Sequence, residues 1–290
     1  MRKKRKYAYS YSDTLINFLS RPVRLAVLVI LLISVIFPLY WLITNTLKIP
    51  SEYIRNPPVM FPTVITLDNF VDIFVKYGAL KGFTNTGIVA VATTLVCMFF
   101  GSMAAYAIVK GKMAKKLRNF FGLWFMIQKM YPAISIAIPV YIVMRYLSLI
   151  DTLLALIIMY TSFNLPLVVW LMIGFFQEVP AEIEQSGIID GCSMWQRYWL
   201  LAMPITKPGL VASGILTFVS AWNEFLFAAL LSINRAKPLS VTLAGFITDK
   251  GLEWGPMAAM AVLLTVPVIV VVWLMQRDFV AGLSMGSVKE

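Results

Sequence analysis

The stretch PAEIEQSGIIDGCSMWQRYWLLAMPITKP, residues 180–208, decides how the rest of this chain is interpreted. It carries three carboxylates and many other polar groups in a sequence that is 60% apolar and only 13% charged. That composition lies far outside the range of soluble globular domains and is typical of an integral membrane protein. We therefore expect the polar stretch to lie outside the bilayer, where another protein can contact it.

The local pattern of residues 180–208 predicts two short helices joined at a glycine. Pro180 suits the first position of a helix, and the two glutamates that follow offset the positive end of the helix macrodipole. Gly191 supplies a backbone break. Ser193-x-x-Gln196 then has the form of a capping box that starts a second helix running to Leu201. Two helices joined in this way make a rigid protrusion.

Around this segment, the chain contains six stretches long and apolar enough to cross a membrane, which takes roughly 20 residues each. Pro132 and Pro139 interrupt the third stretch and Pro166 the fourth, which spanning helices tolerate because neighbours re-satisfy the freed carbonyls. The helix kinks at these prolines either line a cavity or serve only the packing of the helices. We expect one domain over residues 1–290, with spans at about 25–46, 86–109, 119–145, 153–176, 209–232 and 257–276.

The distribution of basic residues predicts the orientation of these spans, because Lys and Arg are retained on the cytoplasmic side. With the N-terminus inside, 16 Lys and Arg residues fall on the cytoplasmic side and eight outside. Both termini and residues 177–208 are therefore expected in the cytoplasm. The net charge of +11 is concentrated at 2–6 and 110–118, beside membrane entry points, which favours contact with lipid headgroups over nucleic-acid binding.

The sequence offers no catalytic or metal-binding constellation. It has no histidine, the commonest general base and metal ligand, and no Gly-x4-Gly-Lys-Ser/Thr phosphate loop. Cys97 lies in an apolar run and Cys192 in the polar stretch, so the pair indicates neither a disulfide nor a metal site. If ATP drives this protein, another chain hydrolyses it.

The spacing within the polar stretch resembles the EAA motif of ABC importer permeases. In that motif Glu-Ala-Ala is followed by three residues, a glycine, nine more residues and Ile-x-Leu-Pro. The slots here hold Gln185-Ser186-Gly187, Gly191 and Leu201-Ala202-Met203-Pro204, with the spacing intact although the first three residues differ. Trp222-Asn223-Glu224-Phe225 and the loop pattern Thr66-Leu67-x-Asn69-Phe70, part of an expected external surface helix over 67–77, also resemble sugar importers of the maltose type.

The resemblance implies an all-α membrane protein with six transmembrane helices, the type I ABC importer permease fold, and a cytoplasmic coupling helix between spans four and five. It implies a non-catalytic subunit of the bacterial inner membrane that moves a sugar or oligosaccharide by alternating access. The implied partners are a second homologous permease, an ATPase dimer that binds ATP and Mg, and an extracytoplasmic solute-binding protein; no cofactor is expected in this chain.

Other transport functions stay open at this level. The solute could instead be an acidic (uronate) oligosaccharide, or glycerol phosphate or a polyol. An ion-coupled secondary transporter is the alternative class, although it would be expected to show inverted halves and several intramembrane carboxylates.

The candidate coupling residues follow from the motif. Gln185 cannot form the salt bridge that a glutamate in its slot could offer, so other carboxylates become the candidates for basic residues of the ATPase. Gly187 permits close backbone approach but makes a helix less stable by up to about 1 kcal/mol relative to Ala. The full candidate set is Glu182, Glu184, Gln185, Ser186, Gly187, Asp190, Gly191, Leu201 and Pro204.

Polar residues within the spans are the candidates for the translocation path. Asn223 and Glu224 lie at membrane depth beyond a stripe of small residues from Gly209 to Ala221, and either contact solute or anchor the other permease. Lys129 in the third span requires a partner or water, either a buried acid such as Glu224 or an anionic solute. Further candidates for binding hydroxyls are Gln128, Tyr131, Tyr160 and Asn164.

Overall fold

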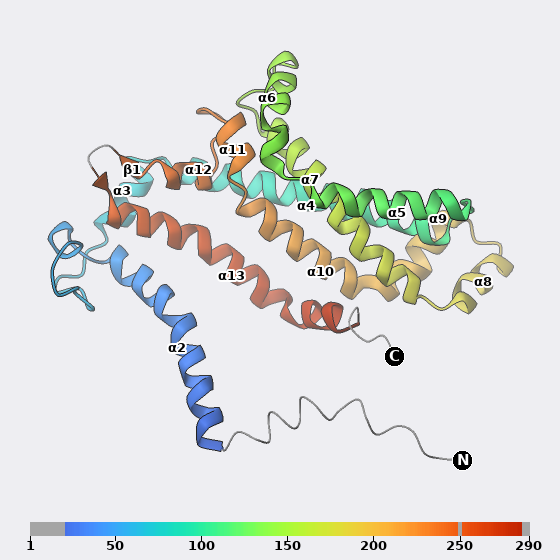
Figure 1. The fold of residues 1–290 in the computed structure, drawn as a ribbon, viewed down its shortest axis with the longest axis horizontal. Helices are drawn as coiled ribbons and strands as arrows, with labels where there is room; N and C mark the ends of the chain where they lie inside the picture. The colour runs from blue at the N-terminus through green and yellow to red at the C-terminus, as the bar shows by residue number, and fades with distance from the viewer. Residues whose placement is uncertain (1–20, 249–250, 286–290) are drawn as a thin grey trace.

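The structure is a computed structural model that describes residues 21–248 and 251–285, so the predictions for the two chain termini lie outside the described residues. Four long helices, α4, α7, α10 and α13, run side by side along the long axis of the molecule, and α2 diverges from them (Figure 1). The long helices are α2 (Arg21–Thr46), α4 (Ala79–Lys110), α7 (Leu153–Glu178), α10 (Met203–Trp222) and α13 (Trp254–Met285).

Shorter elements close the two ends of this bundle. At one end lie α3, α12 and a two-stranded antiparallel hairpin in which Ile247 pairs with Leu252; α8 and α9 lie at the other end (Figure 1). The short helices and turns are η1 (Pro50–Glu52), α3 (Asp68–Val75), α5 (Lys115–Met130), η2 (Ala133–Ile136), α6 (Ala137–Tyr146), α8 (Ala181–Ile189), α9 (Met194–Gln196), a π-helical turn (Arg197–Ala202), α11 (Leu226–Leu231) and α12 (Leu239–Ala244), and the strands are β1 (Ile247–Thr248) and β2 (Gly251–Leu252).

Among the described residues, five helices are long and apolar enough to cross a membrane, and a bent pair of helices can supply a sixth span. The predicted third span, 119–145, was expected to be interrupted by Pro132 and Pro139, and the interruption is larger than a kink because α5 and α6 meet at 92°. Tyr131 has an extended backbone there, with φ −75° and ψ 127°. The following Pro132 disfavours helical geometry at Tyr131, so the helix ends instead of kinking.

The predicted fifth span, 209–232, is also corrected. The helix begins before residue 209, at Met194, and ends at Trp222. At that point Glu224 accepts hydrogen bonds from the backbone N–H groups of Phe227 and Ala228, at 2.9 and 3.0 Å, and thereby starts a separate helix, α11. A carboxylate that binds two free N–H groups favours a new helix start over continuation of the old one.

Two hydrophobic clusters hold the long helices together. One lies towards the end that carries α3 and α12 and includes Phe246, Leu239 and Trp222. The other lies towards α8 and α9 and includes Tyr106, which packs edge-on to Phe176. The second cluster therefore forms the base on which residues 180–208 rest.

The end of the molecule opposite α8 is fixed by one buried amide. Asn69 in α3, the expected surface helix, donates from Nδ2 to the carbonyls of Thr46 and Lys48, at 2.9 and 3.1 Å, and to the hydroxyl of Tyr53 at 3.1 Å. Gly255 at the start of α13 lies so close that an added Cβ would be 2.1 Å from the Asn69 side chain. Hydrogen bonds consequently join α3 to the end of α2 and to the loop after it, and α13 packs closely against Asn69 at Gly255.

Candidate functional site

The helix α8 forms the first half of the segment 180–208. It begins at Ala181, one residue later than predicted, because Pro180 is extended with ψ 138° and precedes the helix. Glu182 and Glu184 lie in the first turn, as expected, where carboxylates interact favourably with the helix macrodipole. The local sequence therefore accounts for the helix.

The break after α8 is a Schellman motif. Gly191 has φ +80°, a left-handed conformation that favours glycine, and its N–H donates to the carbonyl of Ile188 at 3.1 Å. The N–H of Cys192 donates to the carbonyl of Gly187 at 2.8 Å. These two bonds satisfy the last carbonyls of α8 and fix the direction of the chain that follows.

The predicted capping box is present. The N–H of Gln196 donates to the Ser193 hydroxyl at 3.3 Å, and the N–H of Ser193 donates to Gln196 Oε1 at 2.8 Å. The second helix does not end at Leu201, however, because it passes through the π-helical turn directly into α10. Pro204 has no N–H to donate, and the chain accommodates it by a wider turn instead of a break. Movement of α9 must therefore move α10.

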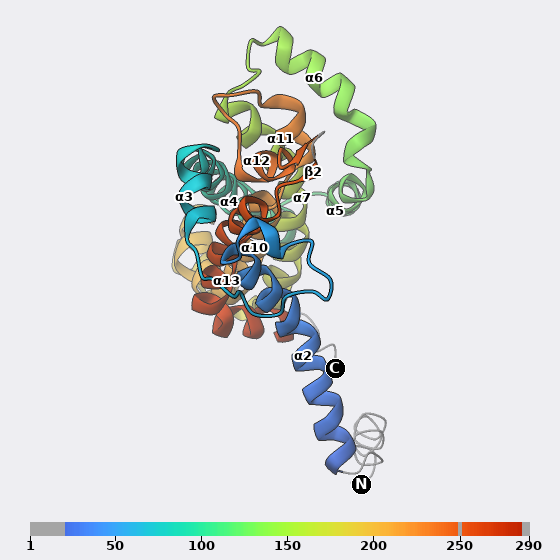
Figure 2. The same cartoon turned by 90° about the vertical axis from the view of Figure 1, so that its left-hand side faces the viewer.

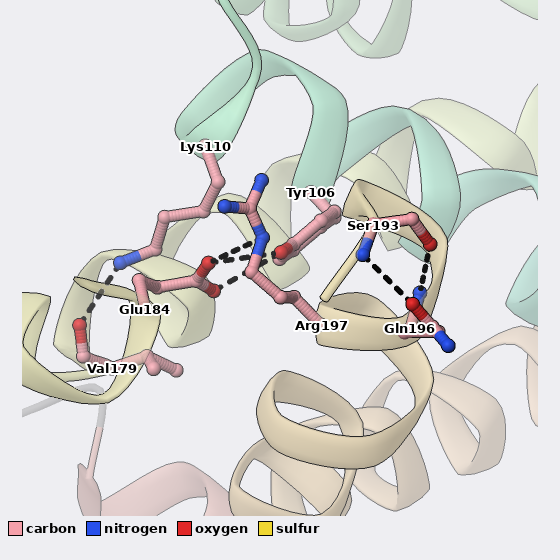
Figure 3. Close-up of polar contacts among 7 residues, drawn as sticks. All are labelled: Tyr106, Lys110, Val179, Glu184, Ser193, Gln196 and Arg197. Carbon is pink, nitrogen blue, oxygen red and sulfur yellow. Dashed lines mark hydrogen bonds and ion pairs between the residues drawn. The ribbon is translucent and has the colours of Figure 1, made fainter. Parts of the chain in front are cut away.

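A buried polar network ties α8 to two other elements (Figure 3). The Glu184 side chain is directed inward, with the residue 8% exposed, and the Tyr106 hydroxyl of α4 lies 3.1 Å from both carboxylate oxygens. Arg197 Nε lies 3.6 Å from the same carboxylate. Lys110, one turn after Tyr106, donates to the carbonyl of Val179 at 3.0 Å. A buried charge paired in this way resists separation of its partners.

The rest of the surface of α8 is exposed, and part of it is apolar. Ile189 is 85% exposed and Ile188 58%, beside the exposed polar residues. Gly187 is buried, and a Cβ at this position would lie 2.6 Å from Leu201 Cδ1, so α8 packs closely against the π-helical turn. The candidates with exposed side chains on α8 or directly after it are Glu182, Gln185, Ser186 and Asp190, and Pro204 is exposed at the start of α10.

The intramembrane candidates do not form one cluster. Tyr160 and Asn164 are buried in the core of the subunit, and Asn164 Nδ2 donates to the Tyr160 carbonyl at 2.8 Å. Gln128 and Tyr131 are exposed on α5 and at its end. Asn223 is exposed at the end of α10 and donates to a carbonyl of its own helix at 2.9 Å.

Of the two partners left open for Lys129, a buried acid such as Glu224 or an anionic solute, the described residues do not show the pair with Glu224. Lys129 Nζ donates to the carbonyl of Phe163 in α7 at 3.3 Å. Glu224 is engaged by the backbone of α11, as described above, because its two oxygens bind the start of that helix. Lys129 is consequently a cation at membrane depth that is exposed on the surface of this subunit.

The described residues contain no group of three His, Cys, Asp or Glu residues placed to hold a metal ion. Cys97 and Cys192 are both free thiols, the first of them buried. What the geometry offers instead is a mechanical element, a protrusion continuous with α10 and bonded to α4.

Residues 97–277 match the family described as "Binding-protein-dependent transport system inner membrane component". The chain belongs to this family. The permease is 33% identical over 88% of its length to the probable ABC transporter permease protein y4oR of Sinorhizobium fredii, of which it covers 90%. It is likewise 33% identical over 88% of its length to the trehalose transport system permease protein SugB of Mycobacterium tuberculosis, of which it covers 92%.

A solved structure supports the fold of the permease. A chain from the crystal structure of a bacterial ABC transporter involved in the import of the acidic polysaccharide alginate superimposes with a TM-score of 0.76 at 23% identity. The match covers 94% of the permease and all of that chain. The permease therefore has the type I ABC importer fold. Its family and its apolar helices make it a multi-pass protein of the inner membrane.

Sequence reasoning missed two features of the site. The inward direction of Glu184 depends on Tyr106, which is 78 residues away in the chain and carries no local signal. The second is the exposure of Ile188 and Ile189, because Ile189 was recognised only as part of the motif's flank.

Proposed function

We propose that this permease is one subunit of an ATP-driven importer that moves a sugar or oligosaccharide into the cytoplasm. A dimer of ATPase subunits would bind ATP and Mg and hydrolyse ATP, so the permease itself is non-catalytic. A second homologous permease would complete the path, and an extracytoplasmic binding protein would deliver the solute. The trehalose permease among its relatives supports a saccharide as the solute.

Residues 180–204 are the docking element for the ATPase in this proposal. The exposed face of α8 presents Ile188 and Ile189 with Gln185, Ser186 and Asp190 around them. Apolar side chains on a cytoplasmic protrusion gain about 25 cal/mol for each Å² that a partner covers. Asp190 and Glu182 are the carboxylates free to meet basic residues of the ATPase, whereas Glu184 is occupied within the subunit.

The buried contact of Glu184 with Tyr106 and Arg197 is the single observation that carries the mechanism. Because it joins α8 to α4 and to the turn that continues into α10, a displacement of α8 is passed to two spanning helices together. Closure of the ATPase dimer would push this element and open the bundle outward, and solute would pass inward after hydrolysis. This sequence of events is alternating access.

The exposed intramembrane residues are the candidates for contact with solute. We assign this role to Gln128, Lys129, Tyr131 and Asn223, whose side chains reach the surface of the subunit, and to the half-buried Glu224, which also starts α11. Tyr160 and Asn164 lie in the core, so their contribution would be to hold α7 in place.

The experiment is ATP hydrolysis by the purified assembly in liposomes, with its binding protein and a saccharide, for Ile189→Lys and a matched control. Ile54→Lys makes the same change at an equally exposed isoleucine, 85%, in the loop expected outside the cell. We expect Ile189→Lys to reduce solute-stimulated hydrolysis at least tenfold, because a charge then enters an apolar contact, while Ile54→Lys behaves as wild type. Equal activities of the two variants would contradict the docking role.

A further inference from the structure

Two adjoining cavities form a single groove between α5 and α7. The first, of about 560 Å³, is lined by Arg118 and Asn119 of α5 and by Gln177 of α7. The second, of about 260 Å³, continues outward to Lys129. Both are lined by Met126 and Trp170, so they adjoin at these two residues. We call this feature the α5–α7 groove; Figure 2 shows α5 standing apart from the rest of the bundle beside α7.

The charges of the α5–α7 groove are all of one sign. Arg118 and Lys129 are its charged lining residues, and no Asp or Glu is among the residues that line it. They stand eleven residues apart on one helix, which places them about 16 Å apart along its axis. In the described part of the chain the ion pairs join Lys76 to Asp72 and Arg197 to Glu184, so neither groove cation takes part in one.

Lys129 needs a partner that the subunit does not supply. An ammonium group has three N–H donors, and one of them reaches the Phe163 carbonyl at 3.3 Å. A lysine within a spanning segment costs at least about 2.5 kcal/mol unless it meets an opposite charge, water or a polar cavity. Lys129 lines the second cavity, so an anion that entered this cavity would lie close to the cation.

The surface between the two cations suits a saccharide. Trp170 is 52% exposed and contributes to both cavities, so it offers a flat aromatic face on which the C–H face of a sugar ring can pack. The amides of Asn119 and Gln177 can bind hydroxyl groups. A phospholipid headgroup fits less well, because its phosphate lies at one depth in the bilayer whereas the two cations lie at different depths.

We propose that the α5–α7 groove conducts a carboxylated oligosaccharide, with Lys129 and Arg118 binding its carboxylates in succession on the way inward. This inference rests on the proposed function, since it names the solute class of the same importer. The positive groove raises the local concentration of an anion and disfavours cations. The two sites are separated, so that an anion can leave one for the other without being held at either.

The test is ATP-dependent uptake into liposomes by the complete importer with its binding protein, with trigalacturonate as the acidic probe and maltotriose as the neutral one. The variants are Lys129→Gln and Arg118→Gln, and the matched control is Lys116→Gln, which removes a cation of α5 outside the groove lining. We expect wild type to import trigalacturonate. Each groove variant should raise the half-saturating concentration of trigalacturonate at least tenfold, while Lys116→Gln leaves it unchanged.

Several results would overturn this inference while leaving the importer function intact. One is ATP-dependent uptake of maltotriose alone by wild type. Another is equal loss of both probes in the groove variants, which would assign the cations to packing or to the second permease. Sensitivity of the variants to the phosphatidylglycerol content of the vesicles, and not to the probe, would assign the groove to lipid. Absence of ATP-dependent uptake of any saccharide would instead overturn the proposed function.

Discussion

At the scale of single residues, the Tyr106 hydroxyl has the largest expected effect. In Tyr106→Phe the buried Glu184 carboxylate loses the hydroxyl that lies 3.1 Å from both of its oxygens. We expect a loss of about 1–3 kcal/mol in the free energy of unfolding, because a buried acceptor is left with fewer donors. The midpoint of thermal unfolding in detergent measures this loss of stability. Tyr146→Phe, which changes an 88% exposed residue, is the control, and equal midpoints for the two variants would contradict the importance of the network.

Asp151 gives a prediction about pH. Burial alone would raise the pKa of its carboxylate, but hydrogen bonds from the backbone N–H of Arg235 and of the other residues in 233–236 lower it below its ordinary value. Those bonds measure 2.8 to 3.1 Å and join the loop before α7 to the loop after α11. A depressed pKa stabilises the fold above the unfolded pKa, about 3.9, and this contribution disappears as pH falls through the folded value.

Thermal midpoints of wild type and Asp151→Asn across pH 3–8 test this assignment. We expect the wild type to be the more stable by a constant margin above about pH 5, because the carboxylate is then ionised in both states. The margin should shrink below about pH 4 as the carboxylate protonates. A margin that stays constant down to pH 3, or one that grows on acidification, would show that the charge of Asp151 is not what holds the two loops together.

The features that could be predicted from the sequence were those that depend on residues close together in the chain. The capping box of Ser193 and Gln196 and the break at Gly191 are set by neighbours within a few residues, so their geometry was predictable. The direction of Glu184 is set by Tyr106 on another helix, and the partner of Lys129 by the path of α7. Such contacts depend on packing between distant parts of the chain, which periodicity and composition do not determine.

At the scale of elements, the glycine after α8 should be the sensitive point of the docking segment. An added Cβ at Gly191 would meet nothing within 4 Å, so only its φ of +80° opposes a side chain. We expect Gly191→Ala to cost roughly 1–2 kcal/mol and to reduce solute-stimulated ATP hydrolysis, because the angle between α8 and α9 changes. Gly174→Ala, in α7 with equally open space, should leave the stability unchanged or raise it by about 0.5–1 kcal/mol. Loss of stability in both variants would contradict the conformational explanation.

The ends of the helices were the features hardest to predict from the sequence. Pro132 was recognised as an interruption, but whether a proline kinks a helix or ends it depends on whether neighbouring groups bind the freed carbonyls. Here the chain turns through 92° between α5 and α6. By contrast, Pro166 and Pro208 lie within continuous helices. The same residue type therefore has different outcomes, and the difference comes from the packing around each proline.

At the scale of the whole molecule, composition was sufficient for the fold class, since apolar stretches of spanning length have few alternatives to helices in lipid. The arrangement of the helices was not deducible, because spanning helices associate through shape and small residues more than through hydropathy.

The exposure of α2 concerns the assembly of the importer. The apolar stretch of α2 is entirely unburied within the subunit, so lipid or another subunit must cover it.

The last prediction concerns the orientation of the permease in the membrane. The expected orientation places α8 in the cytoplasm. The excess of Lys and Arg assigned to the cytoplasmic side, 16 against eight, puts Lys112 inside and Arg55 outside. Both side chains are exposed, so Lys112→Cys and Arg55→Cys in a Cys192→Ser background report the two sides, with Cys97 buried and silent. In intact spheroplasts a membrane-impermeant maleimide should label Arg55→Cys at once and Lys112→Cys only after permeabilisation. The reverse pattern would place α8 outside, where no ATPase could reach it, and would overturn the docking role of α8.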